Sequence, residues 1–467
     1  MTFNNVHIKS FGCQMNKLDT ALVTAALKDA DFCITDDVDA ADIVIINTCS
    51  VRQHAEEKVF SHLGNLKHLK KQKPALIVAL MGCMAQRLGD KLLEEQALDI
   101  VCGPAQIANI IPLIRETIDK RQKTISVTEK IREKADDKAA AELEEFETVF
   151  DGDDKDIPAQ AFVRAMRGCN NFCSYCIVPY VRGPEISRPP QMIIEQIRKL
   201  AGNGVKLVTL LGQTVNSYQY QAGDKTYYLS DLLERASDID GIEWIRFVTS
   251  YPSEKNFEQI ISAMAALPKV CNFLHMCAQS GSDKIIKAMN RHYTAAQYLD
   301  LVDRARAIVP DIAVAGDFIV GFPDETDDDF NQTIDLVKKA RYKNAFVFKY
   351  SPRPGTNAEK KLQDNISAEV KKKRNIELLQ VQNQIGGELA KEFLDKDITV
   401  LVEGLSKKPH LNKTENHENP QLIARTATDW IVVFNGPASL AGQFAKVKIT
   451  RTSPLTLFGR MVNGEKT

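Results

Sequence analysis

The chain has 467 residues, of which 44% are hydrophobic and 26% are charged, and its formal net charge is −1. This length is too great for one ordinary core and predicts roughly two to four domains. No apolar run approaches the roughly 18 residues of a membrane span, and residues 1–13 lack the features of a signal peptide, so we expect a cytoplasmic protein with no membrane partner. The small net charge excludes attraction of nucleic acid by the overall field and leaves that role to local basic patches.

Residues 4–120 alternate predicted strands and helices and are expected to form the first domain. Apolar runs separated by helices are typical of a parallel sheet that is covered on both faces. In such sheets the functional loops gather at the carboxyl ends of the strands. The predicted strands are residues 6–11, 42–47, 75–80 and 98–103, and the predicted helices include residues 18–30 and 54–69.

Residues 121–157 are predicted to be a charged linker. Its segments DDKAAAELEEFE and DGDDKD show no core pattern, and we expect at most one helical turn there.

Residues 158–388 resume the alternation and are expected to form a second α/β domain. Six predicted strands are separated by amphipathic stretches such as residues 190–204 and 332–343. Six such units favour a partial (β/α)6 barrel, which is smaller than the full eight-unit barrel. The predicted strands are residues 162–168, 206–212, 244–250, 272–278, 313–322 and 344–351.

Residues 389–464 change character after a long helical stretch at 368–393. Short predicted strands joined by turns favour a small antiparallel β-barrel. These strands are residues 398–405, 421–427, 430–436 and 445–452.

Three cysteines in a CxxxCxxC pattern follow the first predicted barrel strand. They are Cys169, Cys173 and Cys176, in the segment MRGCNNFCSYCIVPYVRG. Thiolates are the usual ligands of iron–sulfur clusters, and three of them leave the fourth iron of a 4Fe–4S cluster open to chelate a small molecule. A zinc site is the alternative, but zinc usually takes a fourth protein ligand and none is adjacent. The pattern therefore indicates a cluster at the mouth of the barrel, where barrel active sites lie.

A second trio stands in the first domain. Cys13, Cys49 and Cys83 each lie one or two residues beyond the end of a predicted strand. Because strands of one parallel sheet end at the same edge, these three thiols are expected to converge. Three unrelated buried cysteines are the alternative, and the matching position on successive strands argues against it. We therefore predict a second three-thiolate cluster.

The other cysteines show no such placement. Cys102, at the end of a fourth strand, is the best reserve ligand, whereas Cys33, Cys271 and Cys277 are expected to be dispensable for clusters.

Three further residues are candidates for binding a cofactor. Gln213 and Asn216 follow the second barrel strand and face the predicted site, where they could bind the amino-acid end of S-adenosylmethionine (SAM). Loop hydrogen bonding is the alternative role for both. Tyr175, just before Cys176, could lie along an adenine.

Long motifs surround both cysteine trios. They are FGCQMNKLD around Cys13, NTCSVRQHAEEKV around Cys49, MGCMAQR around Cys83 and MRGCNNFCSYCIVPYVRGPEISRP around the barrel trio, with HMCAQSGSDKIIKAMNRHYT and FKYSPRPGT further along. Nearly end to end, this chain resembles the methylthiotransferases of the radical SAM superfamily.

The resemblance implies a methylthiotransferase domain with an auxiliary cluster, a radical SAM core and a TRAM domain that binds RNA. It implies two 4Fe–4S clusters and SAM as cofactors, with all six cysteines of the two trios as metal-binding and catalytic residues. A SAM-derived deoxyadenosyl radical would remove the hydrogen at the 2-position of an adenine, and a second SAM would methylate the transferred sulfur. The implied partners are tRNA, a flavodoxin- or ferredoxin-like electron donor and iron–sulfur assembly proteins.

The branch of the family is indicated by residues around the first two cysteines. GCQMN followed by NTCSVR is similar to the branch that modifies isopentenyladenosine next to the anticodon of tRNA. Alternatives are the branches acting on threonylcarbamoyl-adenosine in tRNA or on a ribosomal-protein aspartate and, from another class, an RNA-binding iron–sulfur regulator. Two departures stand out: Met276, Cys277 and Ala278 replace the family's usual leucine, proline and valine, and ARTATDW is an imperfect glycine-arginine-threonine segment.

Overall fold

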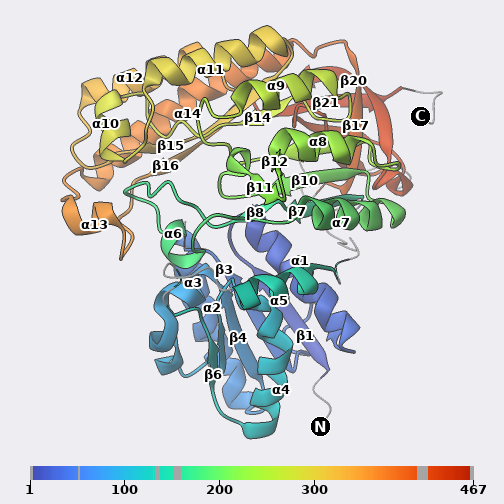
Figure 1. Cartoon of the computed structure of the whole chain (residues 1–467), viewed down its shortest axis with the longest axis vertical. Helices are drawn as coiled ribbons and strands as arrows, with labels where there is room; N and C mark the ends of the chain where they lie inside the picture. Colours follow the sequence, from blue (N-terminus) through green and yellow to red (C-terminus); the bar gives the residue numbers. More distant parts are fainter. Residues whose placement is uncertain are drawn as a thin grey trace.

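The computed structural model contains an N-terminal sheet domain, a central partial barrel and a small C-terminal barrel (Figure 1). Among the residues that it describes, no helix is long and apolar enough to cross a membrane. The described residues are 4–50, 53–129, 131, 137–148, 150, 159–406 and 419–462.

The N-terminal domain is built on a six-stranded parallel sheet with strand order β2-β1-β3-β4-β5-β6. Its central strands β3 and β4 are buried along their whole length, which explains why they read as unbroken apolar runs. The sheet confirms the predicted parallel fold. The strands are β1 (Asn5–Ser10), β2 (Cys33–Ile34), β3 (Ile43–Thr48), β4 (Ile77–Gly82), β5 (Ile100–Cys102) and β6 (Thr124–Ser126).

Helices cover both faces of this sheet. α1 and α4 pack on the face that carries Ile43 and Ile45, whereas α2 and α3 pack on the face that carries Val44 and Ile46. The alternation of these four residues between two cores follows from the two-residue period of a strand. The helical elements are α1 (Gln14–Asp29), α2 (Gln53–Gln72), α3 (Cys83–Leu88), η1 (Gly89–Glu94), η2 (Ile107–Asn109) and α4 (Ile110–Lys120).

The expected charged linker contains more structure than the predicted single turn. Helix α5 runs over twelve residues, Asp137–Thr148. Leu143, Phe146 and the nearby Phe150 are buried in the same core as the barrel strands. The sequence analysis missed this apolar face because the acidic residues between these side chains dominate the composition of the segment.

The central domain confirms the predicted partial (β/α)6 barrel. Its six strands form two parallel three-stranded sheets, β13-β10-β7 and β14-β15-β16. Isolated parallel bridges from Ile245 to Val270 and from Ser250 to Met276 join the two halves. The strands are β7 (Gln160–Arg164), β10 (Leu207–Leu211), β13 (Trp244–Phe247), β14 (Phe273–His275), β15 (Ala313–Val320) and β16 (Asn344–Lys349).

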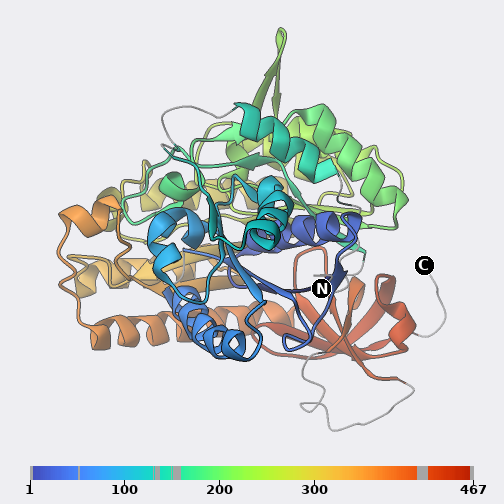
Figure 2. The same cartoon turned by 90° about the horizontal axis from the view of Figure 1, so that it is seen from below.

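Helices line the outside of this barrel, and a hairpin of β11 and β12 projects from it (Figure 2). The longer helices are α7 (Pro190–Gly202), α8 (Leu229–Ser237), α9 (Phe257–Ala266), α11 (Ala295–Ile308), α12 (Asp327–Ala340) and α14 (Ala368–Lys391). The shorter elements are β8 (Met166–Arg167), α6 (Val178–Val181), β9 (Ile186–Ser187), η3 (Val215–Ser217), β11 (Gln219–Ala222), β12 (Lys225–Tyr228), α10 (Asp283–Ala288) and α13 (Asn357–Lys361).

The C-terminal domain is a closed barrel with strand order β17-β18-β19-β21-β20. Four of its strands match the predicted ones, and β21 is a fifth that the pattern did not reveal. All neighbouring pairs are antiparallel except β19 and β21. The elements are β17 (Asp397–Leu405), β18 (Gln421–Arg425), β19 (Ile431–Asn435), η5 (Ala438–Leu440), β20 (Phe444–Thr452) and β21 (Thr456–Met461).

The ARTATDW segment attaches this small barrel to the central one. Arg246 of β13 contacts Asp429 through Nη1 at 3.0 Å and donates through Nη2 to the carbonyl oxygen of Thr426 at 3.1 Å. Lys343 also reaches Asp429, at 3.4 Å. The ARTATDW segment, which departs from the family's usual residues, therefore lies at the contact between the C-terminal barrel and the central barrel.

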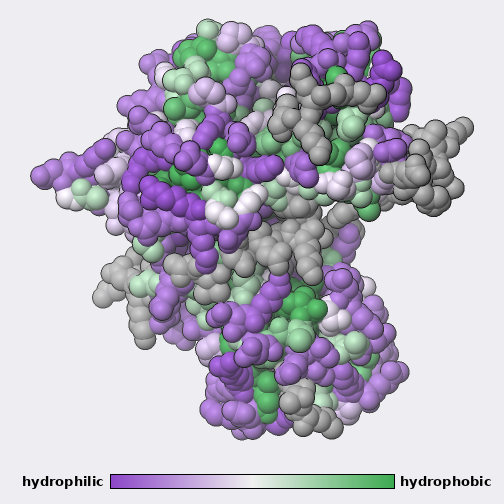
Figure 3. Space-filling view, turned by 90° about the vertical axis from the view of Figure 1, so that its right-hand side faces the viewer, coloured by the Kyte–Doolittle hydropathy of each residue, from purple (hydrophilic) through white to green (hydrophobic). Residues whose placement is uncertain are grey.

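One outer face of the molecule is mostly hydrophilic, with small apolar patches (Figure 3).

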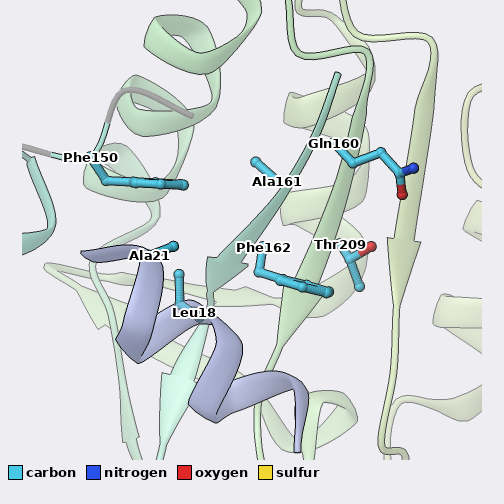
Figure 4. Close-up of a pocket in the computed structure, with 7 residues that line it drawn as sticks. All are labelled: Leu18, Ala21, Phe150, Gln160, Ala161, Phe162 and Thr209. Atoms are coloured by element: carbon cyan, nitrogen blue, oxygen red, sulfur yellow. The ribbon is translucent and has the colours of Figure 1, made fainter. Parts of the chain in front are cut away.

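Apolar side chains pack between the N-terminal domain and the barrel. Leu18 and Ala21 of α1 lie opposite Ala161 and Phe162 of β7, next to Phe150 (Figure 4). The cavity left between them is only about 20 Å³, close to the volume of one water-sized probe. The two domains are thus closely packed here.

A buried network of charges crosses the same boundary. Asp19 of α1 contacts Arg182 at 2.8 Å and Arg164 at 3.8 Å. Glu147 of α5 contacts Arg164 at 2.5 Å and Arg188 at 2.9 Å. Side chains of Asp19, Arg164 and Glu147 are at most 2% exposed, so each charge depends on its partners rather than on water.

Replacing Glu147 with glutamine should lower the stability of the full chain by about 3 kcal/mol, because two buried guanidinium groups each lose one of their two carboxylate partners. Calorimetric unfolding would measure this as a lowered transition temperature. Glu116→Gln is the matched control, since Glu116 pairs with Lys120 on the exposed surface of α4. Equal effects of the two substitutions would show that the buried network does not hold the domains together.

Candidate functional site

A cavity of about 2220 Å³ lies between the three domains. Pockets for small molecules usually measure roughly 300–1,000 Å³, so this one has room for cofactors together with part of a large substrate. Cys13 and Cys49 line it from the N-terminal domain, the barrel trio lines it from the centre, and residues of β17, β18, β19 and β21 line it from the C-terminal barrel.

The N-terminal trio lies at one edge of the parallel sheet, as the strand pattern predicted. Pairing of Ser10 with Asn47 and of Thr48 with Gly82 aligns the carboxyl ends of β1, β3 and β4. Cys13 caps the start of α1, Cys49 follows β3, and Cys83 begins α3.

The approach of these thiols depends on a glycine and on buried amides. Gly12 has φ of +145°, and a Cβ at this position would lie 2.4 Å from the Cβ of Cys49. Asn16 donates to Asn47 Oδ1 at 2.9 Å, which ties α1 to β3. A hydrogen bond with Cys49 lowers the pKa of Cys13 to about 6, which favours its thiolate, the form that binds metal, whereas burial raises the pKa of Cys83.

The barrel trio lies on the loop between β8 and α6. The amide of Cys176 donates to the carbonyl oxygen of Cys173 at 2.9 Å, and the amide of Cys169 donates to that of Gly183 at 3.1 Å. Burial raises the pKa of the Cys169 and Cys176 thiols. Deprotonation there requires a positive charge in the cavity, which cluster iron would supply, so the donor set fits the expected group. Arg291 donates from Nη1 to Cys173 Sγ at 3.6 Å.

The three cofactor candidates have different environments. Gln213 lines the cavity, and its Oε1 is buried without a hydrogen-bond partner among the described residues, which suits an incoming donor. Tyr175 also lines the cavity, with its hydroxyl 3.3 Å from Nη1 of Arg291. Both ends of the Asn216 amide bond to the backbone of Tyr251 at 2.8 Å. Asn216 therefore has the loop-bonding role that was the alternative.

A further cavity cluster, His275, Cys277 and Asp317, escaped sequence analysis. These are the one group of three or more possible ligand side chains in the described chain whose ligand atoms lie within 4.8 Å of one another. The backbone N–H of Thr249 donates to His275 Nδ1 at 3.3 Å, which leaves the ring proton on Nε2, facing Asp317 at 3.2 Å. Cys277 donates to the same carboxylate at 2.9 Å. The three side chains thus contact one another, and we assign them as a hydrogen-bonded cluster.

The remaining cysteines lie apart from both trios. Cys102 is buried and donates to the carbonyl oxygen of Gln106 at 3.2 Å, and burial raises its pKa to about 12. Cys271 is buried beside Arg246, and Cys33 is exposed. None of these three thiols lines the cavity.

Three family models match this chain. Residues 5–103 match an uncharacterised protein family (UPF0004), residues 163–337 match the radical SAM superfamily and residues 396–462 match the TRAM domain.

Curated relatives cover almost the whole chain. The tRNA-2-methylthio-N(6)-dimethylallyladenosine synthase of Rhodopirellula baltica is 40% identical, over 98% of this chain and 95% of the relative. The protein of the same name from Clostridium botulinum is 41% identical, over 97% of this chain and 96% of the relative. Among solved structures, the radical SAM methyltransferase TsrM from Kitasatospora setae has a TM-score of 0.52 at 14% identity, covering 77% of each chain, and so shares the fold.

Replacing Cys169, Cys173 and Cys176 by alanine should leave about half of the roughly eight irons expected for two 4Fe–4S clusters. The reason is that the N-terminal trio belongs to a separate sheet. Iron analysis after anaerobic reconstitution would measure this, with Cys271→Ala and Cys277→Ala as controls that keep the full content. Loss of all iron from the triple variant, or of half from a control, would contradict the assignment.

Proposed function

This chain belongs to the family of the tRNA-2-methylthio-N(6)-dimethylallyladenosine synthases, and we propose that it adds a methylthio group to the 2-position of isopentenyladenosine next to the anticodon of tRNA. The main support for the proposal is that the whole barrel trio and two cysteines of the N-terminal trio, Cys13 and Cys49, line one cavity. Cys83, which is 2% exposed, packs in one small core with Ile177, and Ile177 lines the same cavity.

The chain's residues divide the work within that cavity. The barrel trio would hold a 4Fe–4S cluster with one open iron, and Cys13, Cys49 and Cys83 would hold the second. With SAM, these clusters supply a radical that removes hydrogen from carbon and a sulfur to replace it. Gln213 and Tyr175 orient SAM, and the surrounding walls exclude water from the reacting atoms.

The C-terminal barrel supports an RNA substrate. Arg451 and Phe458 line the cavity, with the guanidinium carbon 3.6 Å from the centre of the ring. An arginine stacked on an aromatic ring is a surface on which bases stack, and its charge suits phosphate. The target adenine must leave its stack to reach the barrel mouth, which costs little in an anticodon loop that is already single-stranded.

Apolar side chains favour the isopentenyl branch over the alternatives. Phe346 is 50% exposed and Leu405 is 58% exposed, and both line the cavity. Such surfaces suit a five-carbon hydrocarbon better than the charged threonylcarbamoyl group or an aspartate. An iron–sulfur regulator would need no cavity shared by two open clusters.

We further propose that a flavodoxin- or ferredoxin-like protein supplies the electron and that assembly proteins load the clusters. Because the substrate is tRNA, we place the enzyme in the cytoplasm.

A panel of anticodon stem-loops should separate the branches. The reconstituted enzyme should modify the isopentenyladenosine loop roughly 1,000-fold faster than the unmodified loop, because five buried carbons at about 0.8 kcal/mol each contribute about 4 kcal/mol. It should leave the threonylcarbamoyl-adenosine loop unmodified. Mass spectrometry of the nucleosides would measure the products, and equal rates on all three loops would contradict the proposal.

The apolar wall can be tested in the same assay. Phe346→Ala should lower the ratio of the modification rate of the isopentenylated loop to that of the unmodified loop. Ile376→Ala is the matched control, because Ile376 is also exposed, at 46%, but lies on α14 outside the cavity wall. A ratio that falls equally in both variants would remove Phe346 from the specificity argument.

A triple variant, Cys13→Ala, Cys49→Ala, Cys83→Ala, should still release deoxyadenosine from SAM under a strong reductant but form no methylthio product. SAM cleavage needs one electron and one open iron, whereas an iron occupied by SAM cannot also present sulfur. Chromatography of deoxyadenosine and nucleosides would measure both reactions. A methylthio product from this variant would exclude the second trio from sulfur transfer.

A further inference from the structure

The two cysteine trios are connected by a short stretch of the chain. Cys176, the last cysteine of the barrel trio, is followed at once by α6, and Arg182 stands directly after that helix. Helix α6 packs against α3, whose first residue is Cys83. Cys83, Ile177 and Val181 form a small buried core between them. The two trios are therefore connected through closely packed side chains.

Arg182 contacts the N-terminal trio directly. Its Nε donates to Cys83 Sγ at 3.3 Å, and its Nη2 donates to Asp19 Oδ2 at 2.8 Å. Its side chain is 4% exposed and that of Asp19 is fully buried. Asp19 thus fixes the plane of the guanidinium, and the N–H that points at Cys83 cannot exchange its partner for water.

A donor aimed at a ligand sulfur changes the chemistry of the metal behind it. Hydrogen bonds to cluster sulfurs favour the reduced, more negative state and so raise the reduction potential. The permanent positive charge of an arginine acts in the same direction. Arg291 makes the corresponding but longer contact with the barrel trio, at 3.6 Å from Cys173.

We infer that Arg182 is a positioning residue that raises the reduction potential of the N-terminal cluster and fixes its ligand Cys83 relative to the barrel loop. This inference rests on the proposed function, because it requires a cluster on Cys13, Cys49 and Cys83. It assigns to a barrel residue a role at the cluster of another domain.

Arg182→Gln removes the charge, and Arg182→Lys keeps the charge but not the fixed N–H. A redox titration of the reconstituted full chain, followed by electron paramagnetic resonance, would give both midpoints. The N-terminal signal is the one that persists when Cys169, Cys173 and Cys176 are replaced. For Arg182→Gln we expect its midpoint to fall by the equivalent of about tenfold in the reduction equilibrium, about 59 mV for one electron. In Arg182→Lys the midpoint potential of the N-terminal cluster should also fall, but by less than in Arg182→Gln.

Arg291→Gln is the matched control and should move the barrel signal alone. Unchanged midpoints in both Arg182 variants at full iron content would overturn the inference. A shift of the barrel signal instead of the N-terminal one would overturn it as well. Absence of a second cluster signal from the wild-type chain would contradict the proposed function itself, so the two failures are distinguishable.

Discussion

The pairing of Asp19 with Arg182 is the contact on which the arrangement of the site depends. One partner lies on the first helix of the N-terminal domain, and the other lies just beyond the barrel cysteines. A buried carboxylate and a buried guanidinium are each costly alone, so the two domains are most stable where both charges are paired. That orientation brings Cys13 and Cys49 to the same cavity as the barrel trio.

The remaining features follow from this orientation. Helix α5 adds the buried Glu147 and the partly buried Glu144 to the charge network and Phe146 to the core, so the segment between the domains becomes part of their contact. The C-terminal barrel closes the third side through Asp429 and its partners on the central barrel. The result is a single cavity that is lined by the barrel trio, by Cys13 and Cys49, and by strands of the C-terminal barrel.

Local patterns predicted much of this structure. The apolar runs of β1, β3 and β4 placed Cys13, Cys49 and Cys83 at one sheet edge, because parallel strands share an edge and a direction. The same reasoning failed for contacts between distant segments. Nothing near Arg182 indicates its partner on α1, and nothing near Cys277 indicates Asp317, since neither pair shares a helix or a strand. Asn216, a polar residue after a strand end, bonds to the backbone of Tyr251 in the loop after β13, and the sequence pattern does not distinguish such a contact from ligand binding.

We propose that this chain installs the methylthio group on isopentenyladenosine in tRNA. Mass spectrometry of tRNA nucleosides from a strain whose gene for this chain is deleted tests it most directly. In that strain we expect 2-methylthio-isopentenyladenosine to disappear and isopentenyladenosine to accumulate in its place, and we expect the wild-type gene to restore the methylthio nucleoside. An unchanged nucleoside profile in the deletion strain, or a loss confined to threonylcarbamoyl-adenosine derivatives, would contradict it.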